Sequence, residues 1–298
     1  MRRRCFLSLL GAGLLLPVRR ALAWAKPDEF KSGEVKSGEV DLLGAQLQLG
    51  GAWGGSAPAD AAAVIESMRV GCLAGVALVS DGQPKRLRID NKTGRNPSVW
   101  LHSGQSTTAW VTVIVGTRDW CNLAYQFGHE LGHVLCNSWE RNAKPRNPCQ
   151  WLEEALAEAF TLRGLQRMAD NWARSPPFPN DAAYAGAIRS YRETLLAGYR
   201  TTAHEQGMAA GFGSWFADHE ALFHAHGGLD DARGAVSTML DLLEDDAEAV
   251  ADLGALNRWP GRSGIPLPDY LDRWEESCAQ LGAPNRLPGR IRGLLANG

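Results

Sequence analysis

Apolar residues recur at helical spacing in several parts of the 298-residue chain. After Asp119, a residue type that favours helix N-caps, Leu123, Phe127 and Leu131 lie four apart. This pattern predicts a helix that ends near Asn137. Similar patterns predict further helices at 59–69, 151–169, 181–198, 214–226, 229–244 and 267–281. The second half of the chain is therefore expected to be mostly helical.

Strand patterns lie in the first half of the chain. Runs rich in apolar, β-branched and aromatic residues predict strands at 72–80, 85–90, 98–103 and 108–116. The glycine-rich stretch 44–58 is expected to be a loop, and the repeated "KSGEV" unit at 31–40 an exposed segment or short strand. The order of elements predicts an α+β fold, with a small sheet followed by a helical lobe.

The N-terminus has the features of an export signal. Three arginines precede an apolar run at 6–18, and "ALAWA" at 21–25 offers the small residues of a cleavage site. "RRCFLS" at 3–8 resembles a twin-arginine signal, although an ordinary secretory signal fits as well. The apolar run is too short for the roughly 20 residues that span a bilayer, so no stable membrane insertion is expected after cleavage. We expect a periplasmic or secreted protein.

Composition and charge exclude some partners. A hydrophobic fraction of 45% is ample for a core, and loss of the five arginines of the signal would change the formal charge from −2 to −7. No basic stripe remains that would indicate binding to nucleic acid. Five cysteines would survive cleavage, and in an oxidising compartment a disulfide between Cys136 and Cys149 is the expected pairing.

The stretch "GHELGH" carries candidate metal chemistry. His129 and His133 are four residues apart, so on a helix both imidazoles project from one face and can bind one ion. Glu130 points about 100° away from His129, where its carboxylate can take a proton from a metal-bound water without binding the metal itself. The alternative is a pair of surface histidines on an ordinary helix. Gly128 and Gly132 would allow a neighbouring backbone to come close.

A second motif, "WLEEALAE" at 151–158, follows on the next predicted helix. With HExxH, it resembles the gluzincin zinc metallopeptidases, over roughly 108–160. The family's "WLxEGxAE" context places Glu154, 21 residues after His133, on the third zinc ligand and Glu158 on the acid that orients the first histidine. Ala155 and Phe160 depart mildly from the family pattern. On the helix, Glu153 projects about 100° away from Glu154 and is not expected at the site.

The resemblance implies a zincin-like fold and one Zn²⁺ per chain. His129, His133 and Glu154 would hold the zinc, and Glu130 would be the general base that hydrolyses a peptide bond of a peptide or protein substrate. Family members bind extended substrate along a strand edge beside the HExxH helix, which points to 108–116. The expected parts are the signal at 1–25, a strand-containing lobe at 26–137 and a helical lobe at 138–298.

Several questions stay open at the level of sequence. A non-catalytic zinc-binding interaction module and a zinc amidase acting on cell-wall or other non-protein amides are the alternatives to a peptidase. The cluster at 219–226 has no histidine pair at helical metal spacing, so no second metal is expected there, and the buried position predicted for Arg163 has no explanation. The oligomeric state is not readable. Candidate donors to the oxyanion formed in hydrolysis are Tyr184, Tyr191, Tyr199, His204 and His219.

Overall fold

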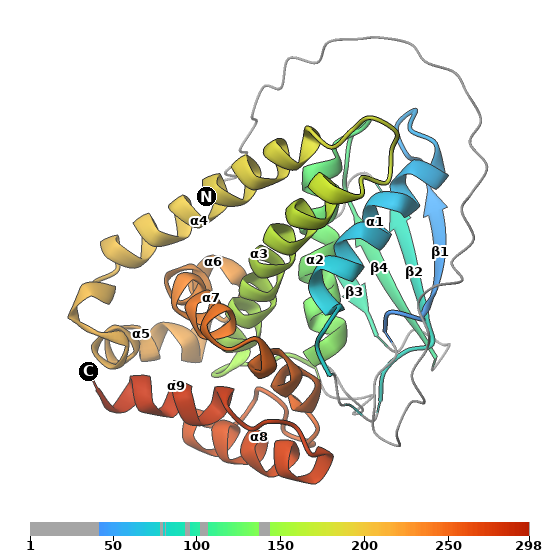
Figure 1. Ribbon diagram of the computed structural model, residues 1–298. Helices are drawn as coiled ribbons and strands as arrows, with labels where there is room; N and C mark the ends of the chain where they lie inside the picture. Colours follow the sequence, from blue (N-terminus) through green and yellow to red (C-terminus); the bar gives the residue numbers. More distant parts are fainter. Residues whose placement is uncertain are drawn as a thin grey trace. The chain divides into compact units, whose positions relative to one another are not determined.

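The computed structural model describes residues 42–77, 80, 82–92, 96–101, 107–136 and 144–297. Within them, four strands form one mixed sheet in the order β1-β2-β4-β3 (Figure 1). The strands are β1 (Gln46–Gly51), β2 (Arg86–Asn91), β3 (Ser98–Trp100) and β4 (Thr108–Val113). β1, β2 and β4 run parallel to one another, and β3 pairs antiparallel with β4. The edge strand beside β4 is therefore reversed relative to the rest.

Alternation of side chains decides which face of the sheet is buried. Leu87 and Ile89 of β2 align with Ala109 and Val111 of β4, and all four are fully buried. Residues between them, such as Arg88, point to the other face because successive strand side chains alternate. The apolar face packs against α1 (Pro58–Leu73) and α2 (Trp120–Cys136) (Figure 1).

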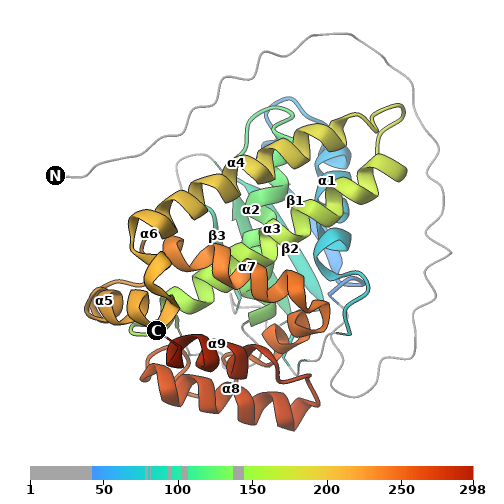
Figure 2. The same ribbon diagram turned by 60° about the vertical axis from the view of Figure 1, so that its left-hand side comes forward.

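The long helix α3 (Gln150–Arg174) is the centre of the helical part. It packs against α1 and α2 on one side and against α4 and α7 on the other (Figure 2). Because α3 has neighbours all around, most of its residues are buried, including acidic ones. The remaining helices in the described residues are α4 (Tyr184–Glu205), α5 (Phe212–Ala225), α6 (Leu229–Ala232), α7 (Val236–Asp245), α8 (Leu267–Leu281) and α9 (Leu287–Ala296), with 3₁₀ turns η1 (Met208–Ala210), η2 (Arg233–Ala235) and η3 (Ala247–Ala255).

The α+β class and most predicted elements are confirmed, and the corrections have local causes. The strand predicted at 72–80 is wrong, because Cys72 and Leu73 end helix α1 and pack in the core. A short apolar run cannot by itself distinguish a buried strand from a helix end. The loop predicted at 44–58 contains strand β1, and the helix predicted at 229–244 is divided into α6, η2 and α7. Helix α9 and η3 were not predicted.

The disulfide predicted between Cys136 and Cys149 is absent. Both thiols are buried and free, and Cys149 donates a hydrogen bond from Sγ to the carbonyl of Ile265 at 3.2 Å. Cys149 therefore faces the segment before α8 rather than the end of α2.

Several predictions concern residues that the structure does not describe. The signal at 1–25 and the repeat at 31–40 lie outside the described residues, as does the expected lobe boundary at 137. The described residues belong to one compact unit. Among the helices of the described residues, none has the length and apolar character needed to cross a membrane.

Candidate metal centre

Helix α2 carries both histidines close to α3. A Cβ atom placed on Gly132 would lie 2.9 Å from Ala157 Cα, and one on Gly128 would meet the side chains of Met68 and Thr161. The close approach of a neighbouring backbone is therefore found at Gly132, whereas Gly128 faces side chains only. The helix pairing brings the face of α2 with the two imidazoles against the first half of α3.

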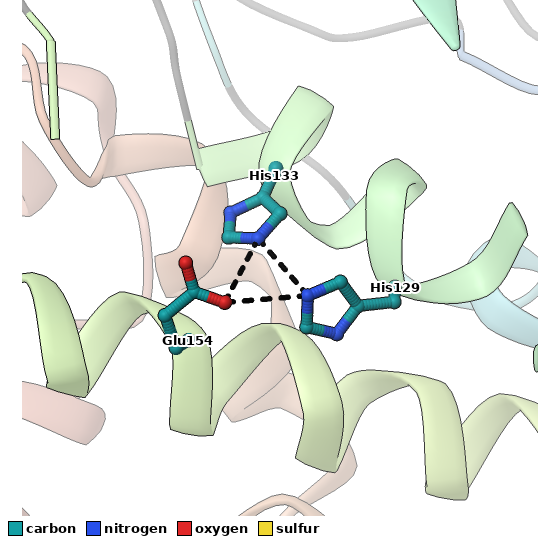
Figure 3. A group of neighbouring side chains, drawn as sticks. All are labelled: His129, His133 and Glu154. Carbon is teal, nitrogen blue, oxygen red and sulfur yellow. Dashed lines mark hydrogen bonds and ion pairs between the residues drawn. The ribbon is translucent and has the colours of Figure 1, made fainter. Parts of the chain in front are cut away.

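Three side chains from α2 and α3 bring one ligand atom each to a common point (Figure 3). His129 Nε2 and His133 Nε2 are 3.2 Å apart, and Glu154 Oε2 lies 3.3 Å from the first and 3.4 Å from the second. Ligand atoms at about 2.0–2.1 Å from a tetrahedral zinc ion are about 3.3–3.4 Å from one another. These three atoms, called the donor triangle below, therefore match three corners of a zinc coordination tetrahedron. Their residue types also fit zinc.

Each imidazole is held from its other nitrogen by a second carboxylate. His129 Nδ1 lies 3.0 Å from Glu158 Oε2, and His133 Nδ1 lies 3.0 Å from Glu153 Oε1. Since an ionised carboxylate only accepts hydrogen bonds, each Nδ1 is the donor. This leaves each Nε2 as the atom that can bind a metal, as in carboxylate–histidine–zinc arrangements. The role predicted for Glu158 is thus matched by its contact.

Glu153 is a residue of the candidate site that helical projection missed. It was expected to point away from the site, but it is 1% exposed and contacts His133. Projection treats a helix as having one buried face, whereas α3 is enclosed on several sides. A carboxylate that lies off the Glu154 face is therefore still buried, on the Nδ1 side of His133.

Residues from the helical lobe hold these two carboxylates. Tyr199 donates its hydroxyl hydrogen to Glu158 Oε1 at 2.8 Å. Arg262 donates from Nη2 to Glu153 Oε1 at 2.7 Å, and Asn257 donates from Nδ2 to Glu153 Oε2 at 2.8 Å. Both carboxylates are therefore fixed by hydrogen bonds on each side. Nothing in the sequence around 257–262 indicates this contact.

The carboxylates stabilise positive charge at the donor triangle. Burial disfavours protonated His129, but hydrogen bonds with Glu154 and Glu158 outweigh this effect and raise its pKa to about 9. Burial is likewise outweighed at His133, where Glu154 and Glu153 raise the pKa well above its usual value. For Glu154, burial favours the neutral acid, yet the two imidazoles lower its pKa. The site thus favours a cation at its centre.

Glu130 lies beside the donor triangle without being part of it. Its side chain is buried, and burial raises the pKa of its carboxyl group, with His129 and His133 opposing that shift and Glu154 adding to it. The charges of the three candidate ligands therefore act on the carboxyl group of Glu130, which directly follows His129 on α2. A buried carboxylate adjacent to a metal site is suited to accept and return a proton.

The predicted oxyanion donors have different surroundings. Tyr199 is committed to Glu158, Tyr184 shares a hydrogen bond with Cys121 Sγ at 3.3 Å, and Tyr191 packs edge-on against Tyr125. His204 is exposed, and His219 Nδ1 contacts the carbonyl of Trp215 at 2.7 Å. None of these contacts selects one residue as the oxyanion donor. The Tyr199 hydroxyl already donates its hydrogen to Glu158.

Two other expectations can be compared with the described residues. In the described residues, the donor triangle is the group of side chains that could hold a metal ion, and no such group is found around 219–226. Strand β4 was expected to offer a free edge for substrate, but it is paired on both sides, and β3 forms the edge of the sheet instead. Strand pairing cannot be derived from the strand sequence alone.

Comparison of the sequence with protein-family models gives no match, and comparison with curated proteins gives none either. Inference about activity therefore depends on the residues of this chain and on their arrangement.

Proposed function

We propose that this protein is a zinc-dependent metallopeptidase of the gluzincin type that acts outside the cytoplasm. The observation that carries the proposal is the donor triangle, with edges of 3.2–3.4 Å and a buried Glu130 beside it. Two imidazoles and one carboxylate leave a fourth position free, as in catalytic rather than structural zinc sites. The zincin-like fold and the export route belong to the same proposal.

The residues divide the work of hydrolysis. His129, His133 and Glu154 hold the ion, and bound zinc would supply a Lewis acid that polarises the substrate carbonyl and makes water easier to deprotonate. Glu130 takes a proton from the attacking water while the water oxygen bonds to the carbonyl carbon. As the C–N bond breaks, Glu130 passes that proton to the leaving nitrogen, so the products are a carboxylic acid and an amine.

Glu130 also separates the peptidase from a zinc-binding interaction module. A structural site needs its three or four ligands, but it does not need a buried carboxylate next to them. Replacing Glu130 with Gln keeps the shape of the side chain and removes its ability to accept the proton of water. Zinc should stay bound, and turnover should fall by at least the roughly 10²- to 10⁴-fold typical of lost general acid–base catalysis.

Zinc content and hydrolysis would be measured on the same preparations of wild type, Glu130→Gln and Glu154→Ala. Glu154→Ala is the matched control, because it removes a ligand and should lose both zinc and activity. Full activity of zinc-loaded Glu130→Gln would refute the mechanism. A wild type that binds zinc but cuts no member of a broad peptide library would favour the interaction module, and cleavage of cell-wall amides alone would favour the amidase.

A further inference from the structure

The loop that follows η3 makes the contacts that hold Glu153, and it is called the anchor loop below (residues 257–263). We propose that the anchor loop positions His133 through Glu153, and that the zinc affinity of the chain depends on this support. The inference rests on the metal centre of the proposed function. It adds Glu153, Arg262 and Asn257 to the site as positioning residues.

The geometry fixes the Glu153 carboxylate in two directions. Its Oε1 accepts from Arg262 Nη2 at 2.7 Å and from His133 Nδ1 at 3.0 Å, while its Oε2 accepts from Asn257 Nδ2 at 2.8 Å. All three residues of the Glu153–Arg262–Asn257 group are at most 3% exposed. The carboxylate cannot rotate without losing a hydrogen bond in a buried place, where an unmade bond is costly. The hydrogen bond from His133 Nδ1 to this fixed carboxylate therefore sets the direction in which His133 Nε2 points.

Asn257 ties this group to the helices that carry the ligands. Its backbone has φ +61°, a left-handed conformation that Asn adopts more readily than most residues. Its Nδ2 also donates to the carbonyl of Cys136, the last residue of α2, at 2.9 Å, and its Oδ1 accepts from Tyr270 of α8 at 2.9 Å. One amide thus connects the end of α2, the start of α3 and α8.

The anchor loop is also fastened to the entry of α3. The carbonyl of Ser263 accepts from the backbone N–H of Cys149 at 3.0 Å, and its Oγ accepts from the N–H of Arg146 at 2.7 Å. These contacts hold the loop against the N-terminal end of α3, close to Glu153 and Glu154. The anchor loop is therefore held in a fixed position relative to Glu154, the candidate ligand on α3.

The charge of Arg262 makes the support of His133 different from that of His129. Glu158 is held by the neutral hydroxyl of Tyr199, whereas Glu153 is held by a guanidinium at 2.7 Å. A buried carboxylate without a cation would be strongly unfavourable, so Arg262 allows Glu153 to remain charged next to the imidazole. A lysine would keep the charge but lose the planar fork of donors.

The test is the zinc dissociation constant of the full-length chain, measured by competition with a chromophoric chelator. Glu153→Gln and Arg262→Gln are expected to weaken zinc binding about 10- to 100-fold, as losses of ligand-orienting partners usually do. The zinc affinity of Arg262→Lys should lie between that of these two variants and that of wild type. The control is Arg192→Gln, because Arg192 is also buried but pairs with Glu244 and the carbonyl of Leu162. It should lower stability without changing zinc affinity.

A second readout separates positioning from general stability. In zinc-loaded protein labelled with ¹⁵N-histidine, the Nδ1–H signal of His133 should shift in Glu153→Gln and Arg262→Lys and stay unchanged in Arg192→Gln. If Glu153→Gln and Arg262→Lys both keep wild-type zinc affinity and an unchanged His133 signal, the inference is overturned and the proposed function stays intact. A wild type that does not bind zinc would overturn both. If Arg262→Gln does not fold, Arg262→Lys and Glu153→Gln decide the question in the same way.

Discussion

Gly132 offers a sharp test of how closely the two ligand-bearing helices must approach. A Cβ atom at Gly132 would lie 2.9 Å from Ala157 Cα and 3.0 Å from Ala157 Cβ. Carbon atoms in contact are normally about 3.5–4.0 Å apart, so Gly132→Ala requires about 0.5–1 Å of relief. Neither backbone nor Cβ atoms can rotate out of the way. The substitution must therefore move α2 away from α3.

That movement acts directly on the donor triangle, because two of its atoms come from α2 and one comes from α3. Functional sites need their groups held within about 0.5 Å, so a separation of this size should weaken zinc binding about 10- to 100-fold. Overpacking should also lower the stability of the metal-free protein by about 1–3 kcal/mol. The higher helix propensity of alanine, worth about 1 kcal/mol, offsets part of this loss.

Gly128→Ala is the matched control on the same face of α2. A Cβ atom there would meet the end of the flexible Met68 side chain and, at 3.1 Å, Cγ2 of Thr161. Side-chain movement can relieve both contacts, so zinc affinity should stay near that of wild type. Chelator competition and urea unfolding would be measured on both variants. Unchanged zinc affinity in folded Gly132→Ala, or equal losses in both variants, would refute the reasoning.

Two further predictions follow from buried charges. Since the pKa of His129 is raised to about 9 in the metal-free protein, this imidazole is protonated at pH 7, and zinc must displace the proton. Calorimetry in buffers of different ionisation enthalpy should show at least about one proton released per zinc bound at pH 7. Zinc affinity should also rise with pH up to about 9. Zinc binding that does not depend on pH would contradict the prediction. Arg163 is 4% exposed, and its Nη1 and Nη2 have no hydrogen-bond partner, so Arg163→Met should raise the free energy of unfolding by about 1–3 kcal/mol. A loss of stability in urea unfolding would show that the guanidinium is compensated.

The candidate ligands were predictable because their relations are local. HExxH fixes two imidazoles on one helix face, and the spacing from Glu154 to Glu158 is one turn of the next helix. Glu153 was not predictable in the same way, because its burial depends on what covers the other side of α3. Its partner Arg262 is 109 residues further along the chain, beyond the reach of any periodicity.

The errors in the sheet have a similar origin. The runs 85–90, 98–103 and 108–116 contain strands because β-branched and aromatic residues fit a pleated, half-buried surface. The order β1-β2-β4-β3 depends on contacts between segments far apart in the sequence, so the edge position of β3 was not readable. The apolar residues that end α1 were taken for a strand because burial on α3, and not strand pairing, explains their character.

The helical lobe supplies side chains that support the candidate metal centre. All three candidate ligands lie on α2 and α3, yet each histidine is backed by a carboxylate that a later segment holds. Tyr199 of α4 holds Glu158, and the anchor loop between η3 and α8 holds Glu153. A chain that ended after α3 would keep every candidate ligand and lose both supports. The binding of a metal and the packing of the helical lobe are therefore expected to stabilise each other, because both favour the same orientation of the two imidazoles.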